Sequence, residues 1–228
     1  MSRRTSRPAL GRRRRRGEEG AATVEAALIT GVVFFIILGI LEMTFIGRDY
    51  VGVTSAARVG ARIASTAADA GPCVAETTDE VPCPSRMVPE LAQQAADEIG
   101  RSVVSLPKES IKYLLVYKAN QSGNPSVTRA TPTLAGCVTE CVAYKWYPSQ
   151  QRFRYFQGTW DSSRIDACAT SRKSADGSSG KLDTVGVKIA VDHKFLSGLF
   201  GRTMELGDHA VMKFEPLANK GCAAGEHA

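Results

Sequence analysis

Two glutamates bracket the most apolar stretch of the chain. Glu25 precedes it, Glu42 follows it, and the 16 residues from 26 to 41 carry no charge. A carboxylate inside a membrane costs about 2.5–3.5 kcal/mol on insertion scales, so an acid retained there usually has a partner or a function. We therefore expect Glu25 to have a partner or a function, the alternative being a carboxylate wetted by lipid head groups. Glu42 lies near the far boundary, where we expect its carboxylate to reach water.

Six cysteines offer a second kind of chemistry, and all of them follow the apolar stretch. They are Cys73, Cys83, Cys137, Cys141, Cys168 and Cys222. An even number in an oxidising compartment favours three disulfides, whose connectivity the sequence leaves open. A bridge between Cys73 and Cys83 would close a local loop, and it is the pairing that we expect first. The C-x3-C spacing of Cys137 and Cys141 matches neither a redox motif nor a zinc half-site, so we expect no metal site.

The other residues that often do chemistry show no catalytic pattern. His193, His209 and His227 have no nucleophile or paired carboxylates at a recognisable spacing. The segment 171–181 ends in GSSGK, as a phosphate-binding loop would, but it lacks the four-residue spacer and the Ser or Thr after Lys181. We interpret it as a surface loop. The sequence therefore predicts neither an enzyme nor a cofactor.

The positive charge of the chain is concentrated in its first 20 residues. The whole sequence carries 29 Lys and Arg against 23 Asp and Glu. Eight of the arginines and two of the glutamates lie in residues 1–20, so residues 21–228 hold 21 basic and 21 acidic side chains. A nucleic-acid-binding domain would need its positive charge on its own folded surface. We therefore expect no nucleic-acid partner and interpret residues 1–20 as a basic cytoplasmic leader.

Extended to Ile46, the apolar stretch is long enough to cross a membrane. Residues 26–46 number 21, and about 20 are needed to span a hydrocarbon core of about 30 Å. The arginines before the span, with no comparable cluster directly after it, predict a cytoplasmic N-terminus and an extracytoplasmic C-terminal domain. A cleaved secretory signal peptide is the main alternative. Because no A-x-A-like site directly follows the apolar residues, we favour a single-pass span.

The helix that crosses the membrane is expected to continue beyond it. Apolar and small residues recur at spacings of three and four, as on one face of a helix: they are Tyr50, Val53, Ala57, Gly60 and Ala64. No proline interrupts residues 21–70, and Gly71-Pro72 then supplies a stop signal. The simplest interpretation is one helix over 21–70, with its first half anchored and its second half presenting an apolar stripe.

Residues 71–228 have the composition of one mixed soluble domain. An apolar residue every fourth position predicts a helix over 89–104, and alternation or apolar runs predict strands. The expected strands are 111–118, 141–147, 152–156, 185–191 and 210–214, with the second and third forming a hairpin around 148–151. A long helix, a second helix and a largely antiparallel sheet make an α+β fold.

Three short motifs carry a resemblance to a known family. They are Gly20-Ala21-Ala22-Thr23-Val24-Glu25 before the span, Gly39-Ile40-Leu41-Glu42 at its end, and Ala56-Ala57-Arg58-Val59-Gly60-Ala61-Arg62 beyond it. In this order and spacing they resemble the N-terminal region of TadE-like and TadG-like proteins, the minor pilins or pseudopilins of tight-adherence (Tad, Flp) pilus systems. The family often has an aromatic residue and a proline where this chain has Ala26 and Gly31.

The resemblance implies a processing and assembly role for the start of the helix. A prepilin peptidase at the cytoplasmic face would cut between Gly20 and Ala21 and remove the leader. The carboxylate of Glu25 would then attract the new amino group of Ala21 in a neighbouring subunit and set the register between subunits. The partners implied are other pilins and pseudopilins, the peptidase, the secretion platform and the lipid bilayer of the inner membrane. The fold implied is pilin-like.

Two other classes of function remain open on the sequence. Aromatic and basic residues alternate over 145–160, so a permanently anchored domain could bind a surface or ligand through this hairpin, although an ordinary hairpin with Tyr144 and Trp146 on one face explains it too. A secreted hydrolase would need a catalytic constellation that the sequence lacks. The mature N-terminus separates the three: Ala21 for the pilin, an uncut chain for the anchored domain, and cleavage beyond Ile46 for the secreted protein.

Overall fold

The computed structural model describes residues 15–73, 87–102, 106–167, 182–198 and 200–217, with side chains from residue 20 onward. The chain divides into two compact units, Met1–Phe45 and Ile46–Ala228. The first unit is helical wherever it is described. The second contains the rest of that helix, a second helix and a sheet, so the predicted α+β class is confirmed.

The helix α1 runs without interruption over Arg15–Thr66. It begins earlier than the predicted residue 21, because arginine and glutamate are good helix formers and the nearest upstream proline is Pro8. It ends at Thr66, before the expected residue 70. The backbone N–H of Ala70 donates to the carbonyl of Ala67 in a turn, and Gly71 then adopts a left-handed φ of 74° that side-chain-bearing residues avoid.

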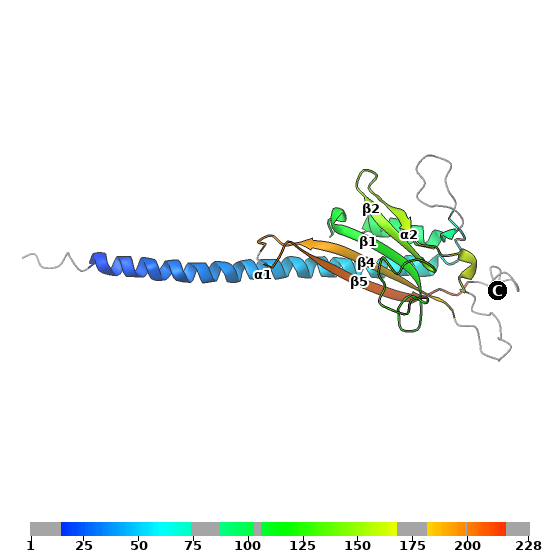
Figure 1. Ribbon diagram of the computed structural model, residues 1–228, viewed down its shortest axis with the longest axis horizontal. Helices are drawn as coiled ribbons and strands as arrows, with labels where there is room; N and C mark the ends of the chain where they lie inside the picture. The colour runs from blue at the N-terminus through cyan, green and yellow to red at the C-terminus, as the bar shows by residue number, and fades with distance from the viewer. Residues whose placement is uncertain (1–14, 74–86, 103–105, 168–181, 199, 218–228) are drawn as a thin grey trace, which may run out of the picture. The chain divides into compact units, whose positions relative to one another are not determined.

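Five antiparallel strands form one sheet in the order β3-β2-β1-β4-β5 (Figure 1). They are β1 (Ile111–Ala119), β2 (Cys141–Tyr147), β3 (Arg152–Gln157), β4 (Thr184–Lys194) and β5 (Thr203–Lys213). The predicted strands all lie within or closely overlap these elements. The hairpin of β4 and β5 is longer than expected, because β5 keeps its pairing with β4 back to Thr203.

Two helices cover one face of this sheet. The second helix, α2, spans Glu90–Ser102 within the predicted range, and it shares a single apolar core with the second half of α1 and the inward side chains of β1, β2 and β4. The helices approach closely because the residues of α1 are small. A Cβ atom added at Gly60 would lie 2.5 Å from Ile99 Cδ1 and 3.0 Å from Val187 Cγ1.

A smaller apolar cluster lies on the opposite face of the sheet. Tyr113, Leu115 and Tyr117 project there from β1, as alternation along a strand requires. Leu134 covers them from the segment between β1 and β2. The Tyr117 hydroxyl donates to the Gly123 carbonyl at 3.0 Å, and burial raises the pKa of this phenol well above its usual value. Both faces of the central strands are therefore covered.

Candidate membrane anchor and assembly segment

The first half of α1 exposes a large apolar surface. Its exposed large side chains are Val24, Leu28, Ile29, Val32, Val33, Phe34, Phe35, Ile36, Ile37, Ile40, Leu41, Met43 and Phe45. They face every direction around the helix, and α1 is long and apolar enough to cross a membrane. An apolar surface of this kind is unfavourable in water, whereas lipid solvates it. The helix therefore has the properties of a membrane anchor, as the sequence predicted.

The predicted processing residues lie near the start of this apolar surface. Gly20 and Ala21 are exposed and lie within α1. Glu25 is exposed as well and follows Ala21 by four residues, so both lie on the same side of the helix, about one turn apart. The backbone thus brings together the three residues for which the resemblance implies processing and assembly.

Glu42 differs from its expected environment. We predicted that its carboxylate reaches water, but only 1% of the residue is exposed. Leu41 and Met43 on either side of it are exposed, so the burial affects one side of the helix. The position of Glu42 along the helix predicts how deep it lies in a membrane. It does not predict whether the side of the helix that carries Glu42 is covered by other residues. Glu42 is also about 25 Å of helix away from Glu25, so the two acids belong to different sites.

Polar side-chain contacts join the second half of α1 to the sheet. His193 Nδ1 lies 2.6 Å from Asp49 Oδ2, and the histidine is 4% exposed. The Thr54 hydroxyl donates to Asp208 Oδ2 at 2.8 Å. No motif around His193 indicates a role, but the alternation that places Val191 inward also places His193 inward two residues later. These contacts fix α1 against both β4 and β5.

One disulfide links Cys137 to Cys141, with 5.1 Å between their Cα atoms. This pairing was not predicted, because a bridge over three intervening residues needs a tight turn. Glu140 supplies it with a left-handed φ of 53°. Cys73 is also in a disulfide, while Cys83, Cys168 and Cys222 lie outside the described residues. The bridge between Cys73 and Cys83 and the total of three remain predictions.

The aromatic hairpin of β2 and β3 divides its side chains between core and surface. Tyr144, Trp146 and Phe153 are buried in the main core, and the Trp146 and Phe153 rings pack edge to face. Tyr147 and Phe156 remain exposed on the other side, next to basic groups: Lys145 Nζ lies 3.6 Å from the Phe156 ring centre. Buried rings cannot contact a ligand, so most of the hairpin's aromatic residues serve packing.

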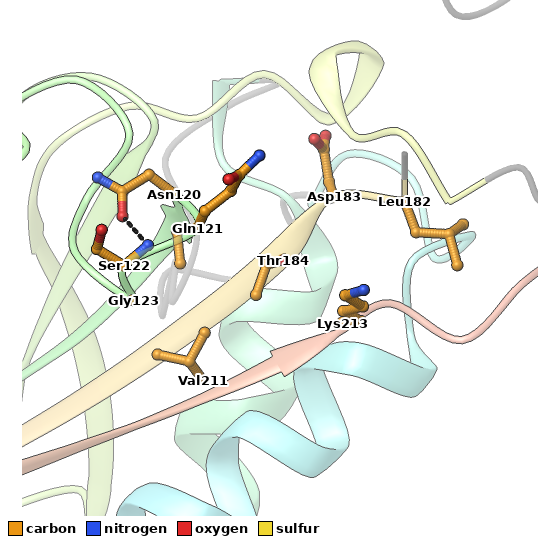
Figure 2. A pocket seen from close by; sticks show the side chains of 10 residues that line it. Asn120, Gln121, Ser122, Gly123, Leu182, Asp183, Thr184, Val211 and Lys213 are labelled. Carbon is orange, nitrogen blue, oxygen red and sulfur yellow. Dashed lines mark hydrogen bonds between the residues drawn. The ribbon is translucent and has the colours of Figure 1, made fainter. Parts of the chain in front are cut away.

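A shallow pocket of about 770 Å³ opens at the end of the sheet where β1 leads into Asn120 and β4 begins. Figure 2 shows that Asn120 already accepts a hydrogen bond from the Ser122 backbone. Asp183 is paired with Lys118 at 2.6 Å. Within the part of the chain that the structure describes, no three His, Cys, Asp or Glu side chains group as metal ligands would. The pocket therefore indicates no particular ligand.

Comparison with known proteins identifies one family. Residues 20–62 match the family model of the TadE-like protein, which confirms the resemblance seen in the sequence. The match covers the anchor half of α1 and most of the half that packs on the sheet. No curated protein and no solved structure matches the chain.

Proposed function

We propose, from the TadE-like match of residues 20–62, that this protein is a membrane-anchored minor pilin or pseudopilin that acts in the assembly of a tight-adherence pilus or a related secretion apparatus. TadE-like proteins are pilus components rather than enzymes. The observation that carries the proposal is the exposed apolar surface of α1 between residues 24 and 45. A helix that is apolar on all sides is stable in lipid or among similar helices.

The basic leader sets the orientation in this proposal. Arginines before the span hold the N-terminus in the cytoplasm, so the α+β domain is extracytoplasmic. A prepilin peptidase at the cytoplasmic face of the inner membrane then cuts between Gly20 and Ala21 and removes the leader. Gly20 and Ala21 are both exposed on α1, which leaves their side of the helix accessible to the peptidase.

Cleavage changes the electrostatics at the start of the span. The new N-terminus is the ammonium group of Ala21, about one helical turn from Glu25 on the same side. A carboxylate and an ammonium in neighbouring subunits attract each other more strongly in lipid than in water, because the dielectric is lower. Pairing of Glu25 with the Ala21 ammonium of a neighbour would neutralise both charges and set the register between the two helices.

The experiment that tests the mechanism replaces Glu25 with alanine. Glu25→Ala should insert normally, since it removes a charge from the membrane, yet it should not co-purify with partner pilins. Val24→Ala is the matched control, because it shortens the neighbouring exposed side chain and keeps the carboxylate. The loss of the leader, measured as a mass change that depends on the peptidase, shows whether each variant is still processed.

A second variant removes the same ion pair by preventing formation of its other partner, the Ala21 ammonium. Gly20→Phe should block cleavage, so the leader stays attached and no Ala21 ammonium forms. Its assembly defect should not add to that of Glu25→Ala, because each change removes the same interaction. Normal co-purification of a processed Glu25→Ala protein would contradict the ion-pair mechanism while leaving the anchor and its processing intact.

A further inference from the structure

The turn between β4 and β5 carries exposed apolar side chains that the core does not use. Leu196 is 72% exposed and Phe200 is 55% exposed. Phe195 is partly buried, with its ring centre 5.3 Å from that of His193 and 6.1 Å from that of Phe200. Lys194 and Arg202, which flank these residues, are exposed. We call Phe195, Leu196 and Phe200 the hairpin tip.

Contacts within the second unit show which way the hairpin tip points. Gly60 of α1 lies against Val187 of β4, and Asp49 of α1 pairs with His193 of β4. Going from Val187 to His193 along β4 therefore means going from Gly60 back to Asp49 along α1. The strand β4 runs antiparallel to α1 and carries the tip toward Ile46, the predicted end of the span.

The lengths of the two elements place the tip at the level of Ile46. Leu196 follows His193 by three residues, which reach up to about 10 Å beyond it in an extended chain. Ile46 precedes Asp49 by three residues, or about 4.5 Å of helix. The tip can therefore reach the plane in which the predicted span ends. It can also pass a few ångströms beyond that plane into the apolar layer of the membrane.

The residues just before the tip are polar and paired. Asp192 of β4 stands opposite Glu205 of β5 in the sheet. Lys112 Nζ lies 2.6 Å from Glu205 Oε2 and 3.7 Å from Asp192 Oδ1. The hydrogen bond from Lys112 lowers the pKa of Glu205, which keeps that carboxylate charged. The hairpin thus changes from charged to apolar within a few residues, as a protein does where it enters a membrane interface.

We propose that the hairpin tip inserts into the leaflet next to the α+β domain, with Leu196 and Phe200 among the acyl chains and Lys194 and Arg202 at the lipid phosphates. The inference rests on the proposed membrane span of α1, which brings Ile46 to the same surface. With α1 and the tip both in the bilayer, the domain has two points of attachment. It would then be unable to rotate freely about the axis of α1.

The bilayer fits the tip better than a second copy of the chain. The tip can reach the level of Ile46, where the proposed span ends, so lipid would be present at that depth. Its flanking Lys194 and Arg202 complement anionic head groups, and long basic side chains at this depth reach the phosphates while their stems remain in the apolar layer. A neighbouring subunit would have to supply an apolar groove with acidic edges at the same height.

Tryptophan quenching by brominated lipid tests the inference on the full chain. The protein carrying Leu196→Trp is reconstituted in vesicles of phosphatidylethanolamine and phosphatidylglycerol, with or without bromine on the acyl chains. The native Trp146 and Trp160 are buried in the core, so their emission gives a constant background. Val127→Trp is the matched control, because Val127 is exposed and lies near Lys118, at the opposite end of β1 from Ile111.

Insertion of the tip predicts that brominated acyl chains quench the added emission of Leu196→Trp and leave that of Val127→Trp unchanged. Equal emission with and without bromine would overturn the inference if the protein still resists alkaline extraction, because the span would then hold without the tip. Emission shielded from aqueous acrylamide but not quenched by bromine would also overturn it, in favour of a second copy. Extraction of the protein from the vesicles would instead contradict the proposed span.

Discussion

The two halves of α1 are parts of one continuous helix with opposite surfaces. In the first half the large side chains face outward, and Leu28 is 71% exposed. In the second half Ala57, Ala61 and Ala64 are completely buried. The large apolar residues on the surface of the first half and the small buried residues of the second half indicate that the two halves have different partners. The first half lacks a water-compatible surface and needs lipid or other helices, while the second half is part of the domain's own core.

The glycines of α1 show the same difference. A Cβ atom added at Gly31 or Gly39 would meet nothing within 4 Å, whereas one added at Gly60 would press on Ile99 and Val187. Substitutions in the first half should therefore change membrane behaviour without changing the folding of the domain. Substitutions in the second half should change the folding of the domain without changing membrane behaviour.

Ile36→Lys gives the largest expected effect and tests the first half. A lysine near the centre of a span raises the free energy of insertion by about 3 kcal/mol, so the fraction of protein resistant to alkaline extraction should fall. Val51→Lys is the control, because Val51 is also exposed on α1 but lies beyond the predicted span. An equal loss of extraction-resistant protein for the two variants would show that the end of the predicted span, near Ile46, is misplaced.

Gly60→Leu tests the second half. The new side chain would overpack the contact between α1, α2 and β4, which should lower the free energy of unfolding of the domain by about 2 kcal/mol despite the better helix propensity of leucine. The measurement is denaturant unfolding in detergent, followed by near-ultraviolet circular dichroism. Gly31→Leu should leave the transition where it is; a shift as large as that of Gly60→Leu would mean that the first half also packs in the domain.

Asp49→Ala should have a smaller effect on the same transition. It leaves the buried His193 ring without its 2.6 Å partner, and an unsatisfied buried polar group costs about 1.5 kcal/mol. Asp69→Ala, an exposed acid just after α1, serves as the control. If Asp49→Ala unfolds with the wild-type midpoint, the pair of Asp49 and His193 does not hold α1 to β4. The direction assigned to the hairpin tip would then rest on one of its two contacts only.

Thr54→Val gives the smallest effect. It keeps the shape of the side chain and removes the hydroxyl that donates to Asp208, which should cost about 1 kcal/mol because the contact is partly open to water. Thr44→Val, whose hydroxyl bonds to the Ile40 carbonyl of its own helix, should not change the unfolding of the domain. An effect of equal size at both positions would remove the distinction between the halves.

The helices and strands were largely predictable from local sequence patterns, whereas the side-chain contacts between these elements and the disulfide were not. An apolar run located β1, apolar alternation located β4, and the absence of proline predicted one long α1. The pair of Asp49 and His193 joins positions 144 apart in the sequence, and only the packing of α1 on the sheet brings them together. The disulfide of Cys137 and Cys141 depends on a left-handed turn that no residue pattern announces.

The candidate site divides in the same way. The residues from Gly20 to Glu25 were recognisable because their order along the chain is itself the motif, and the family match includes them. The burial of Glu42 and the apolar tip at Leu196 and Phe200 could not be found by motif. They depend on which side of a helix is covered and on the direction in which a hairpin points.

The most direct test of the account is the mature N-terminus of the protein in its native membrane. Intact mass and N-terminal sequencing of the membrane fraction should show a chain that begins at Ala21, because the leader is removed and α1 remains as the anchor. A chain that keeps residues 1–20 would contradict processing and leave a permanently anchored domain. A chain that begins beyond Ile46 would contradict the anchor itself and indicate a secreted protein.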